Sequence, residues 1–296
     1  MKCSSAAVTG SSGFIGTHLM QELKDRNIDA LGVSPTTNSV DVTKWDDVKQ
    51  IAQKDLLFHL AGITNIPRSF EDPREVYLAN TFGTLNMLEW CRLNDVKKII
   101  YVSTFVYGVP QYLPVDEKHP TAPNNPYSQS KLMGEELCEA YCRDYNLDAT
   151  ILRLFNIYGP LQKGNFLIPQ ILEQLDQETI VLGDPIPKRD FIYIDDVIDA
   201  LICALDRELE GCNIFNIASG SSNSVKDISD ILADIIFDET GKNVSIGYTH
   251  NVRESEITDT IANIDKAKSI LNWQPKTDIK TGLTKTLRAY INEYQK

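Results

Sequence analysis

The chain has 296 residues, of which 42% are hydrophobic and 24% are charged. This composition is ordinary for a soluble globular protein and excludes collagen-like, disordered and coiled-coil classes. The length allows about two domains. With 29 basic and 41 acidic residues the net charge is −12. The field of the whole protein would therefore repel a nucleic acid or an anionic membrane, and any anionic ligand must be held by local donors.

No targeting or membrane-spanning segment is apparent. The N-terminal stretch turns glycine-rich without the apolar core of a signal peptide, and no later stretch is apolar over the length of a membrane helix. We therefore expect a cytoplasmic protein. The six cysteines are scattered and predict reduced core thiols. Cys138 and Cys142 lie one helical turn apart, but no histidine is near them, so no metal site is expected.

Short β-like runs alternate with helical periodicity in the first half of the chain. The expected strands cover residues 6–8, 28–33, 55–62, 97–103 and 149–155, and the expected helices cover residues 14–24, 73–93 and 126–145. Repeated alternation of strand and helix is typical of a parallel sheet with helices on both faces. The fold class is therefore predicted as α/β, with a Rossmann-like doubly wound parallel sheet.

The pattern loosens in the second half. Helices are expected near residues 166–177, 195–207, 225–238, 264–271 and 280–294, with short strands at 180–182 and 191–194, and residues 213–219 could return to the sheet. We expect a dinucleotide-binding Rossmann domain made of residues 1–155 and about 189–219. Residues from about 156–188 and 220–296 would form a smaller C-terminal α/β substrate lobe over the carboxyl ends of the strands.

A glycine-rich segment, TGSSGFIG at residues 9–16, joins the first strand to the first helix. Glycines at such a turn let the backbone approach a pyrophosphate at the helix N-terminus, where free N–H groups and the helix dipole favour anions. This context indicates a dinucleotide site, the alternative being a tight turn with no ligand. The residues assigned to the cofactor here are Gly10, Ser12, Gly13, Phe14, Ile15 and Gly16.

The end of the second strand lacks the acidic residue that commonly binds the adenosine ribose. Its sequence is GVSPTT, ending at Thr37. Without a carboxylate to repel a 2′-phosphate, either NAD or NADP is admissible, and Ser34, Thr36 or Thr37 could donate to that phosphate. This segment contains no arginine that would favour NADP over NAD. Asp41 and Val42 are placed to meet the adenine, and the alternative for Asp41 is an exposed turn carboxylate.

A tyrosine and a lysine begin the helix expected at residues 126–145. Asn125 is a capping residue and Pro126 suits the first helical position. Tyr127 and Lys131 are four residues apart, so both side chains lie on one helix face. A nearby ammonium and a cationic nicotinamide favour the phenolate, which lets the tyrosine exchange a proton with a hydroxyl while hydride moves. Ser103 ends a predicted strand where its hydroxyl could bond the same substrate oxygen.

Together these motifs resemble a known family, the extended short-chain dehydrogenase/reductases that modify nucleotide sugars, which include NAD(P)-dependent epimerases and dehydratases. The resemblance is to UDP-glucose 4-epimerases and also to GDP-4-keto-6-deoxymannose reductases. It runs in the family's order from the first strand to residues 272–277. The segments that carry it are TGSSGFIG (9–16), HLAG (59–62), SFEDP (69–73), NTFGT (80–84), VSTFVYG (102–108), PYSQSK (126–131), RLFNIYGP (153–160) and RDFIYIDD (189–196).

The resemblance implies a catalytic set of Ser103, Tyr127 and Lys131. The cofactor contacts that it adds to the glycine loop are Leu60, Ala61, Gly62, Asn80, Tyr127 and Lys131. The similar 4,6-dehydratases place Asp and Glu directly after the catalytic Ser or Thr, as acid and base for water loss. Here those positions are Thr104 and Phe105, so dehydration lacks its acid/base pair, and Phe105 is expected to pack under the substrate loop.

The resemblance also implies a substrate site. Asn156, Arg189 and Arg253 match positions that contact the nucleotide diphosphate, and Glu256 matches a carboxylate on the nucleotide ribose. Thr104 is assigned to the substrate as well. Guanidinium groups bind phosphate bidentately, whereas the alternative for each arginine is a surface salt bridge. The loop GDPIPKRDF at residues 183–191 departs from many relatives in having proline at position 185, which leaves the mode of base recognition open.

Three functions are compatible with these residues. An NAD(P)-dependent nucleotide-sugar 4-epimerase would move hydride transiently at C4 of a nucleoside-diphosphate hexose. An NADPH-dependent reductase of a nucleoside-diphosphate 4-keto-6-deoxyhexose would use the same residues in one direction, and a dinucleotide sensor would have kept the fold and lost the chemistry. In relatives the helices at 73–93 and 126–145 form a dimer interface, so a homodimer is expected, although Leu85, Met87, Leu88 and Leu137 are equally explained as core.

Overall fold

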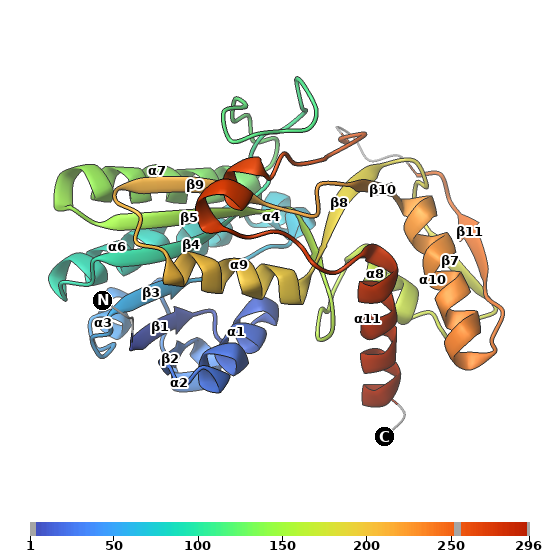
Figure 1. Ribbon diagram of the computed structural model, residues 1–296, viewed down its shortest axis with the longest axis horizontal. Helices are drawn as coiled ribbons and strands as arrows, with labels where there is room; N and C mark the ends of the chain where they lie inside the picture. The colour runs from blue at the N-terminus through green and yellow to red at the C-terminus, as the bar shows by residue number, and fades with distance from the viewer. Residues whose placement is uncertain (1–3, 252–255, 295–296) are drawn as a thin grey trace.

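The computed structural model describes residues 4–251 and 256–294 and is built around one parallel sheet (Figure 1). Its six strands, in spatial order, are β2 (Asp29–Val33), β1 (Ser5–Thr9), β3 (Leu56–His59), β4 (Lys98–Thr104), β5 (Asp148–Leu154) and β9 (Cys212–Ile217). Every pairing between them is parallel. The predicted α/β class is confirmed, and the segment ending at Ile217 does return to the sheet.

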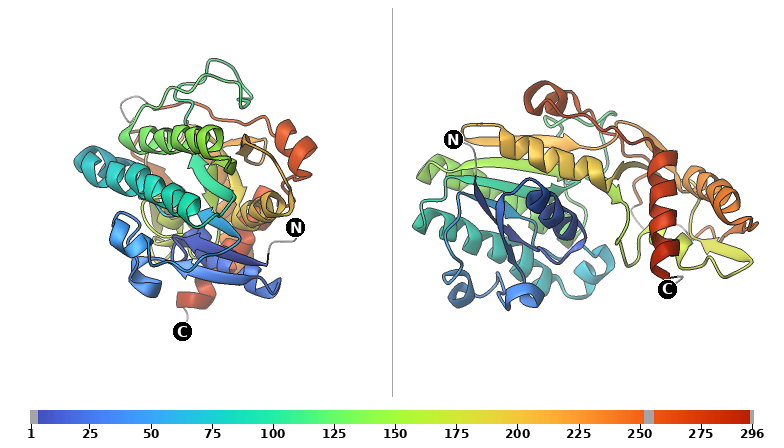
Figure 2. Two further views of the ribbon diagram at one scale, coloured as in Figure 1. Left: turned by 90° about the vertical axis from the view of Figure 1, so that its left-hand side faces the viewer. Right: turned by 60° about the horizontal axis from the view of Figure 1, so that its bottom comes forward.

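Helices cover both faces of this sheet (Figure 2). One face carries α1 (Phe14–Asp25) and α9 (Ile194–Asp206), and the other carries α6 (Gly83–Leu93) and α7 (Pro126–Tyr145). Neighbouring strand residues point to opposite faces, so Val8 packs in the first of these cores and Ala7 in the second. Because both faces are buried, the strands are apolar along most of their length rather than at alternate positions.

The strand order reverses between β1 and β3. In an open parallel sheet, the connections that leave the two strands on either side of such a point run to opposite faces, and a crevice opens at their carboxyl ends. The glycine-rich loop follows β1, the HLAG segment overlaps the end of β3, and Thr104 ends the neighbouring β4. Three of the predicted motifs therefore meet at the carboxyl ends of neighbouring strands.

Residues 73–93, predicted as one helix, form three consecutive pieces. These are α5 (Pro73–Tyr77), a π-helical turn η1 (Leu78–Phe82) and α6. The backbone stays helical through both junctions, so apolar periodicity alone does not reveal the change. A π-helical turn widens the hydrogen-bonded ring by one residue and commonly occurs at functional sites. Here it contains Asn80, which is fully buried.

Beyond the carboxyl ends of the strands lie two small sheets with their helices (Figure 1). One sheet has the order β10 (Ser222–Ser224), β8 (Lys188–Tyr193) and β6 (Asn156–Tyr158), and the other pairs β11 (Ser245–Tyr248) with β7 (Thr179–Leu182). The accompanying helices are α8 (Leu167–Leu172), α10 (Val225–Thr240) and α11 (Ile279–Tyr294), whereas the π-helical turn η2 (Ala267–Leu271) packs against α9 and β9 of the main sheet. Short helices α2 (Pro35–Asn38), α3 (Trp45–Val48) and α4 (Ile66–Glu71) complete the fold.

Two predicted helices are shorter or differently wound than expected. The helix predicted near residues 166–177 ends at Leu172, because the polar residues that follow form turns in which Gln174 and Leu175 bond carbonyls three residues back. The segment predicted as a helix at 264–271 winds into the π-helical turn η2.

The five described cysteines are all free thiols, and Cys3 lies outside the described residues. The described part of the chain holds no cluster of three potential metal ligands. Within that same part, every helix is too short or too polar to cross a membrane.

Candidate active site

A cleft of about 950 Å³ lies at the carboxyl edge of the sheet and receives residues from both parts of the fold. The glycine loop, the end of β4 and the start of α7 line one side, and residues from the small sheets and their loops line the other. The assigned residues that line it are Gly10, Gly13, Phe14, Ile15, Gly16, Leu60, Gly62, Ser103, Thr104, Tyr127, Lys131, Asn156, Arg189 and Glu256. Elements far apart in sequence thus share one site.

The glycine loop fits a pyrophosphate. Gly10 has a φ of +70°, and a Cβ there would lie 2.8 Å from the backbone nitrogen of Ala61, so only glycine suits the turn. Gly13 is the N-cap of α1 and provides no side-chain cap, and the first turn holds no acidic residue. The N-terminus of this 12-residue helix therefore keeps uncapped N–H groups at the cleft wall. The Ser12 side chain is exposed beside this turn.

A buried histidine ties the loop to the sheet. Thr9 Oγ1 accepts the N–H of Ala61 and donates to Nδ1 of His59 across 2.7 Å. Thr84 donates its own hydroxyl hydrogen to the carbonyl of Asn80, so it accepts from Nε2 of His59. Burial, followed by the charge of Lys131, lowers the pKa of His59 to about 3. The imidazole is therefore neutral and serves as a bridge between β1, β3 and α6.

Asn80, predicted to bind the cofactor, connects two backbone segments next to the cleft. Its Oδ1 accepts the N–H of Ile63 at 2.7 Å, and its Nδ2 donates to the carbonyl of Ile63 and to Ser130 Oγ. A Cβ at Gly62 would lie 2.8 Å from Asn80 Oδ1, so glycine is needed for this contact. The amide thus connects the loop after β3 to α7, one residue away from Lys131.

The second strand ends in hydroxyl groups that bond one another. Ser34 is buried, accepts the N–H of Thr37 and donates to Thr37 Oγ1 across 2.7 Å. Thr36 is exposed next to it. Asp41 accepts from the backbone and the hydroxyl of Thr43, which lower its pKa against the opposing effect of burial. The hydroxyl hydrogen of Ser34 is therefore bonded within the turn, whereas the Thr36 side chain is accessible to a ligand.

Tyr127 and Lys131 stand on one face of α7, as predicted from their spacing. Burial raises the pKa of the Tyr127 phenol, and a hydrogen bond with the Thr104 side chain acts in the opposite direction. The Lys131 ammonium lies 4.1 Å from the centre of the Tyr101 ring. Burial lowers the pKa of Lys131 to about 7, although the nearby Glu135 carboxylate favours its charged form. The lysine is thus poised to change charge near neutral pH.

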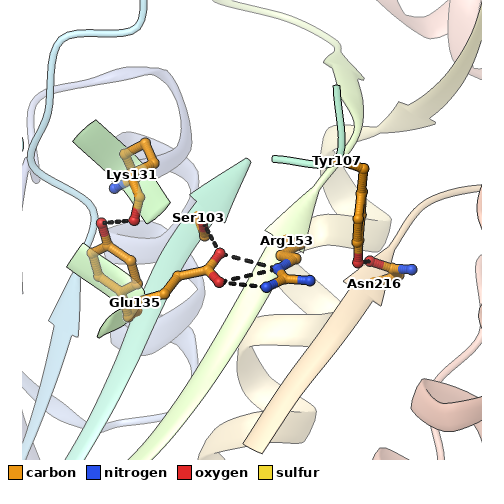
Figure 3. A network of polar contacts seen from close by, with 7 residues as sticks. Ser103, Tyr107, Lys131, Glu135, Arg153 and Asn216 are labelled. Atoms are coloured by element: carbon orange, nitrogen blue, oxygen red, sulfur yellow. Dashed lines mark hydrogen bonds and ion pairs between the residues drawn. The ribbon is translucent and has the colours of Figure 1, made fainter. Parts of the chain in front are cut away.

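Ser103 points toward a buried ion pair (Figure 3). Its hydroxyl donates to Glu135, whose two carboxylate oxygens also accept from Arg153, with the shortest Arg153 contact at 2.6 Å. Glu135 and Arg153 are 4% and 3% exposed. Sequence reasoning missed both residues. The sequence did contain a signal for Glu135, because Tyr127, Lys131 and Glu135 are spaced four residues apart and so share one helix face.

On the other side of the cleft, Arg189 bonds Glu256 and donates to the carbonyl of Ile257 at 2.7 Å. Both side chains are about one-fifth exposed, so this is a half-buried pair at the cleft wall rather than a surface salt bridge. Asn156 is exposed at the start of β6. Arg253, predicted to hold the diphosphate, lies outside the described residues.

Phe105 packs its ring edge to face against Tyr107 and Phe155, with centroids 5.3 and 5.2 Å away. The packing role predicted for Phe105 is confirmed. It also lines the cleft beside Thr104. Val42, assigned to the adenine, lies close to Gly83 at the start of α6, and a Cβ at that glycine would come within 2.9 Å of Val42.

Comparisons with known proteins agree with this geometry. Residues 6–218 match the model of the NAD dependent epimerase/dehydratase family. A putative UDP-glucose 4-epimerase of Methanocaldococcus jannaschii is 36% identical, over 95% of this chain and 96% of that protein. A GDP-6-deoxy-D-mannose reductase of Pseudomonas aeruginosa is 28% identical, over 97% of this chain and 96% of that one.

Solved structures are similar over almost the whole length. The UDP-glucose 4-epimerase of Thermotoga maritima, solved with UDP-glucose, has a TM-score of 0.91 at 27% identity and covers 99% of this chain and 100% of its own. The structure of RMD from Pseudomonas aeruginosa with NADPH has a TM-score of 0.88 at 27% identity, over 98% of this chain and 99% of its own. The fold, the glycine loop and the tyrosine–lysine pair therefore belong to an enzyme of the NAD-dependent epimerase/dehydratase family, of the extended short-chain dehydrogenase/reductase type.

Proposed function

We propose that this chain is an NAD(P)-dependent 4-epimerase of a nucleoside-diphosphate hexose. The observation that carries the proposal is the common cleft, which is lined by Tyr127 and Lys131, by the glycine loop and by the Arg189–Glu256 pair. A hydride exchange on a diphosphate-linked sugar requires a loop that binds the phosphates of the dinucleotide, a titratable hydroxyl and a cation for the sugar diphosphate. The epimerases among the relatives support the same reaction class.

The residues present fit a nicotinamide dinucleotide. The uncapped N-terminus of α1 and the tight turn at Gly10 would hold its pyrophosphate, and Thr36, Asp41 and Val42 are assigned to its adenosine. When bound, the dinucleotide supplies the site that accepts and returns hydride at C4 of the sugar. Relatives with NAD or NADPH in their structures support both forms as candidates.

The chain's own residues move the proton. Tyr127 takes the hydrogen of the C4 hydroxyl and returns it, because its phenol lies in the cleft and bonds Thr104 at the end of β4. Lys131 lies on the same face of α7, and in its protonated form, which its lowered pKa of about 7 makes pH-dependent, it favours the phenolate that can act as base. Neither Thr104 nor Phe105 can serve as the carboxylic acid/base pair of a dehydratase, so water loss from the sugar is not supported.

The substrate diphosphate is assigned to Arg189, with Asn156 beside it and Glu256 toward the nucleotide ribose. In a chain of net charge −12, an anionic sugar nucleotide needs a local guanidinium, and Arg189 is held at the cleft wall by Glu256 and the carbonyl of Ile257. Arg253 is assigned to the same diphosphate from its sequence match alone.

A reductase of a nucleoside-diphosphate 4-keto-6-deoxyhexose is the second candidate. The feature that favours it is the uncharged ribose end, where Thr36 and Thr37 are exposed hydroxyls, the Ser34 hydrogen bonds Thr37, and residues 32–37 hold no carboxylate that would repel a 2′-phosphate. An epimerase recycles its dinucleotide and retains it, whereas a reductase must release it each turn. Purified protein that carries bound nicotinamide supports the epimerase, and protein that consumes NADPH with a 4-keto sugar nucleotide supports the reductase.

A homodimer in the cytoplasm is part of the proposal. Helices α6 and α7 pack side by side, and they expose Leu93, Met133 and Tyr145 on the outer surface of the protein. Exposed apolar side chains on two neighbouring helices suit contact with the same two helices of a second copy. Free described cysteines agree with a reducing compartment. Light scattering of the purified protein measures the dimer directly.

The decisive experiment begins with a panel of UDP-, GDP-, dTDP- and CDP-sugars, tested first by thermal shift and then for conversion to the C4 epimer. Tyr127→Phe keeps the ring and removes the phenol, so turnover should fall by about 10² or more while dinucleotide binding stays nearly unchanged. Wild-type turnover in this variant, or the absence of any C4 product across the panel, would refute the proposed reaction.

A further inference from the structure

The direction of the Ser103 hydroxyl is fixed by its surroundings. Ser103 ends up 2% exposed at the cleft wall, and its side chain donates to the Glu135 carboxylate. A carboxylate only accepts hydrogen bonds, and an arginine only donates. The Ser103 hydrogen therefore bonds Glu135, and the lone pairs of the Ser103 oxygen can accept a hydrogen bond from a ligand in the cleft.

Glu135 itself has no freedom to turn away. Arg153 lies directly opposite Ser103 in the register of β4 and β5, and its Nε and Nη2 reach both carboxylate oxygens at 2.6 to 3.1 Å. The Arg153 guanidinium is in turn 4.9 Å from the centre of the Tyr107 ring, and the Tyr107 hydroxyl donates to Asn216 on β9 (Figure 3). The carboxylate is thus held by a chain of contacts that spans three strands.

We infer that Glu135 is a positioning residue, which holds Ser103 as an acceptor of a hydrogen bond from a sugar hydroxyl and leaves proton donation to Tyr127. This inference rests on the proposed function. Glu135 does not line the cleft, so it acts through residues that do: it accepts the Ser103 hydrogen, and its charge also favours the ammonium form of Lys131. An ion pair that only stabilised the fold would be complete without the serine.

The test is Glu135→Gln, alone and combined with Ser103→Ala. Arg153 offers no acceptor, so the new amide oxygen must face the arginine and the NH₂ group must donate to Ser103. That reverses the serine, whose hydrogen then points into the cleft. We expect kcat/KM for the sugar nucleotide to fall about 10- to 100-fold in the wild-type background, the range for a buried hydroxyl that loses its acceptor. In the Ser103→Ala background the same change should cost much less activity, because only the effect of the lost charge on Lys131 remains.

A buried carboxylate that does not line the cleft supplies the matched control. Asp196 is 2% exposed and accepts the backbone N–H groups of Lys276 and Thr277. Asp196→Asn should lower the melting temperature but leave kcat/KM unchanged. If Glu135→Gln does not fold, because Arg153 is left unpaired, the double variant Glu135→Met/Arg153→Met removes both charges and makes the same prediction.

A readout that needs no turnover separates this inference from the proposed reaction. The infrared carboxylate band of Glu135, isolated as the difference from Glu135→Gln, should shift when Ser103 becomes alanine. Losses of activity that multiply in the combined variant, or a band that does not move, would overturn the positioning role. A wild-type protein that converts no sugar nucleotide would instead overturn the proposed function, and the band shift would then decide the orientation of Ser103.

Discussion

Lys131 should make the protein less stable, although the proposed reaction needs it. The residue is 4% exposed, and burial lowers the pKa of its ammonium from 10.5 to about 7. The unfolded chain keeps the ordinary value, so between about pH 7 and about pH 10.5 it binds a proton that the folded chain lacks. Stability therefore rises with pH through that window, and the full cost of the buried ammonium is present at and below about pH 7.

The size of the effect follows from the shift. The change in pKa from 10.5 to about 7 corresponds to about 5 kcal/mol at pH 6, at 1.36 kcal/mol for each pKa unit, and to about 2 kcal/mol at pH 9. Lys131→Met keeps an apolar stem of similar length and removes the charge. We expect the variant to be more stable than the wild type by about 3–5 kcal/mol at pH 6, with the gain shrinking to about 2 kcal/mol at pH 9.

Urea unfolding of both proteins at pH 6, 7.5 and 9, without dinucleotide, measures this difference. The titratable neighbours do not interfere, because burial lowers the pKa of His59 to about 3 and raises the pKa values of Tyr101 and Cys138 well above their ordinary values. Lys97→Met, at a side chain that is 61% exposed, is the control and should change stability little. A Lys131→Met protein that is less stable than the wild type at pH 6, or a gain that does not shrink at pH 9, would refute the reasoning.

Three further predictions follow from the cleft. Arg189→Ala should weaken sugar-nucleotide binding by about 1.5–3 kcal/mol and leave dinucleotide affinity unchanged, as calorimetric titration with each ligand will show; equal losses for both would contradict the assignment. Thr36→Asp should weaken NADP(H) more than NAD(H), through repulsion of the 2′-phosphate, and a native protein that strongly prefers NAD(H) would refute this interpretation. Gly62→Ala should displace Asn80, 2.8 Å from the new methyl group, and lower stability by about 1–3 kcal/mol, whereas Gly183→Ala, with nothing within 4 Å, should not.

The features that the sequence determined by itself are local ones. The glycine loop is specified by Gly10 and Gly13, because a left-handed turn and an uncapped helix start depend on residues next to one another. The shared face of Tyr127 and Lys131 follows from helical spacing alone. The parallel sheet follows from the alternation of apolar strands with amphipathic helices, which short-range periodicity records.

Only the tertiary structure decided how these parts are braced. Ser103 faces Glu135 and Arg153 because of the register in which β4 pairs with β5 and the way α7 packs on these strands. Neither the register nor this packing can be predicted from the spacing of neighbouring residues. The cofactor contact of Asn80 stays a prediction, whereas its bonds to the backbone of residue 63 depend on the π-helical turn, which local spacing does not reveal. Pairing across the cleft, as in Arg189 with Glu256, likewise depends on how distant segments pack, because the free energy that selects such contacts comes from the whole core and not from neighbouring residues.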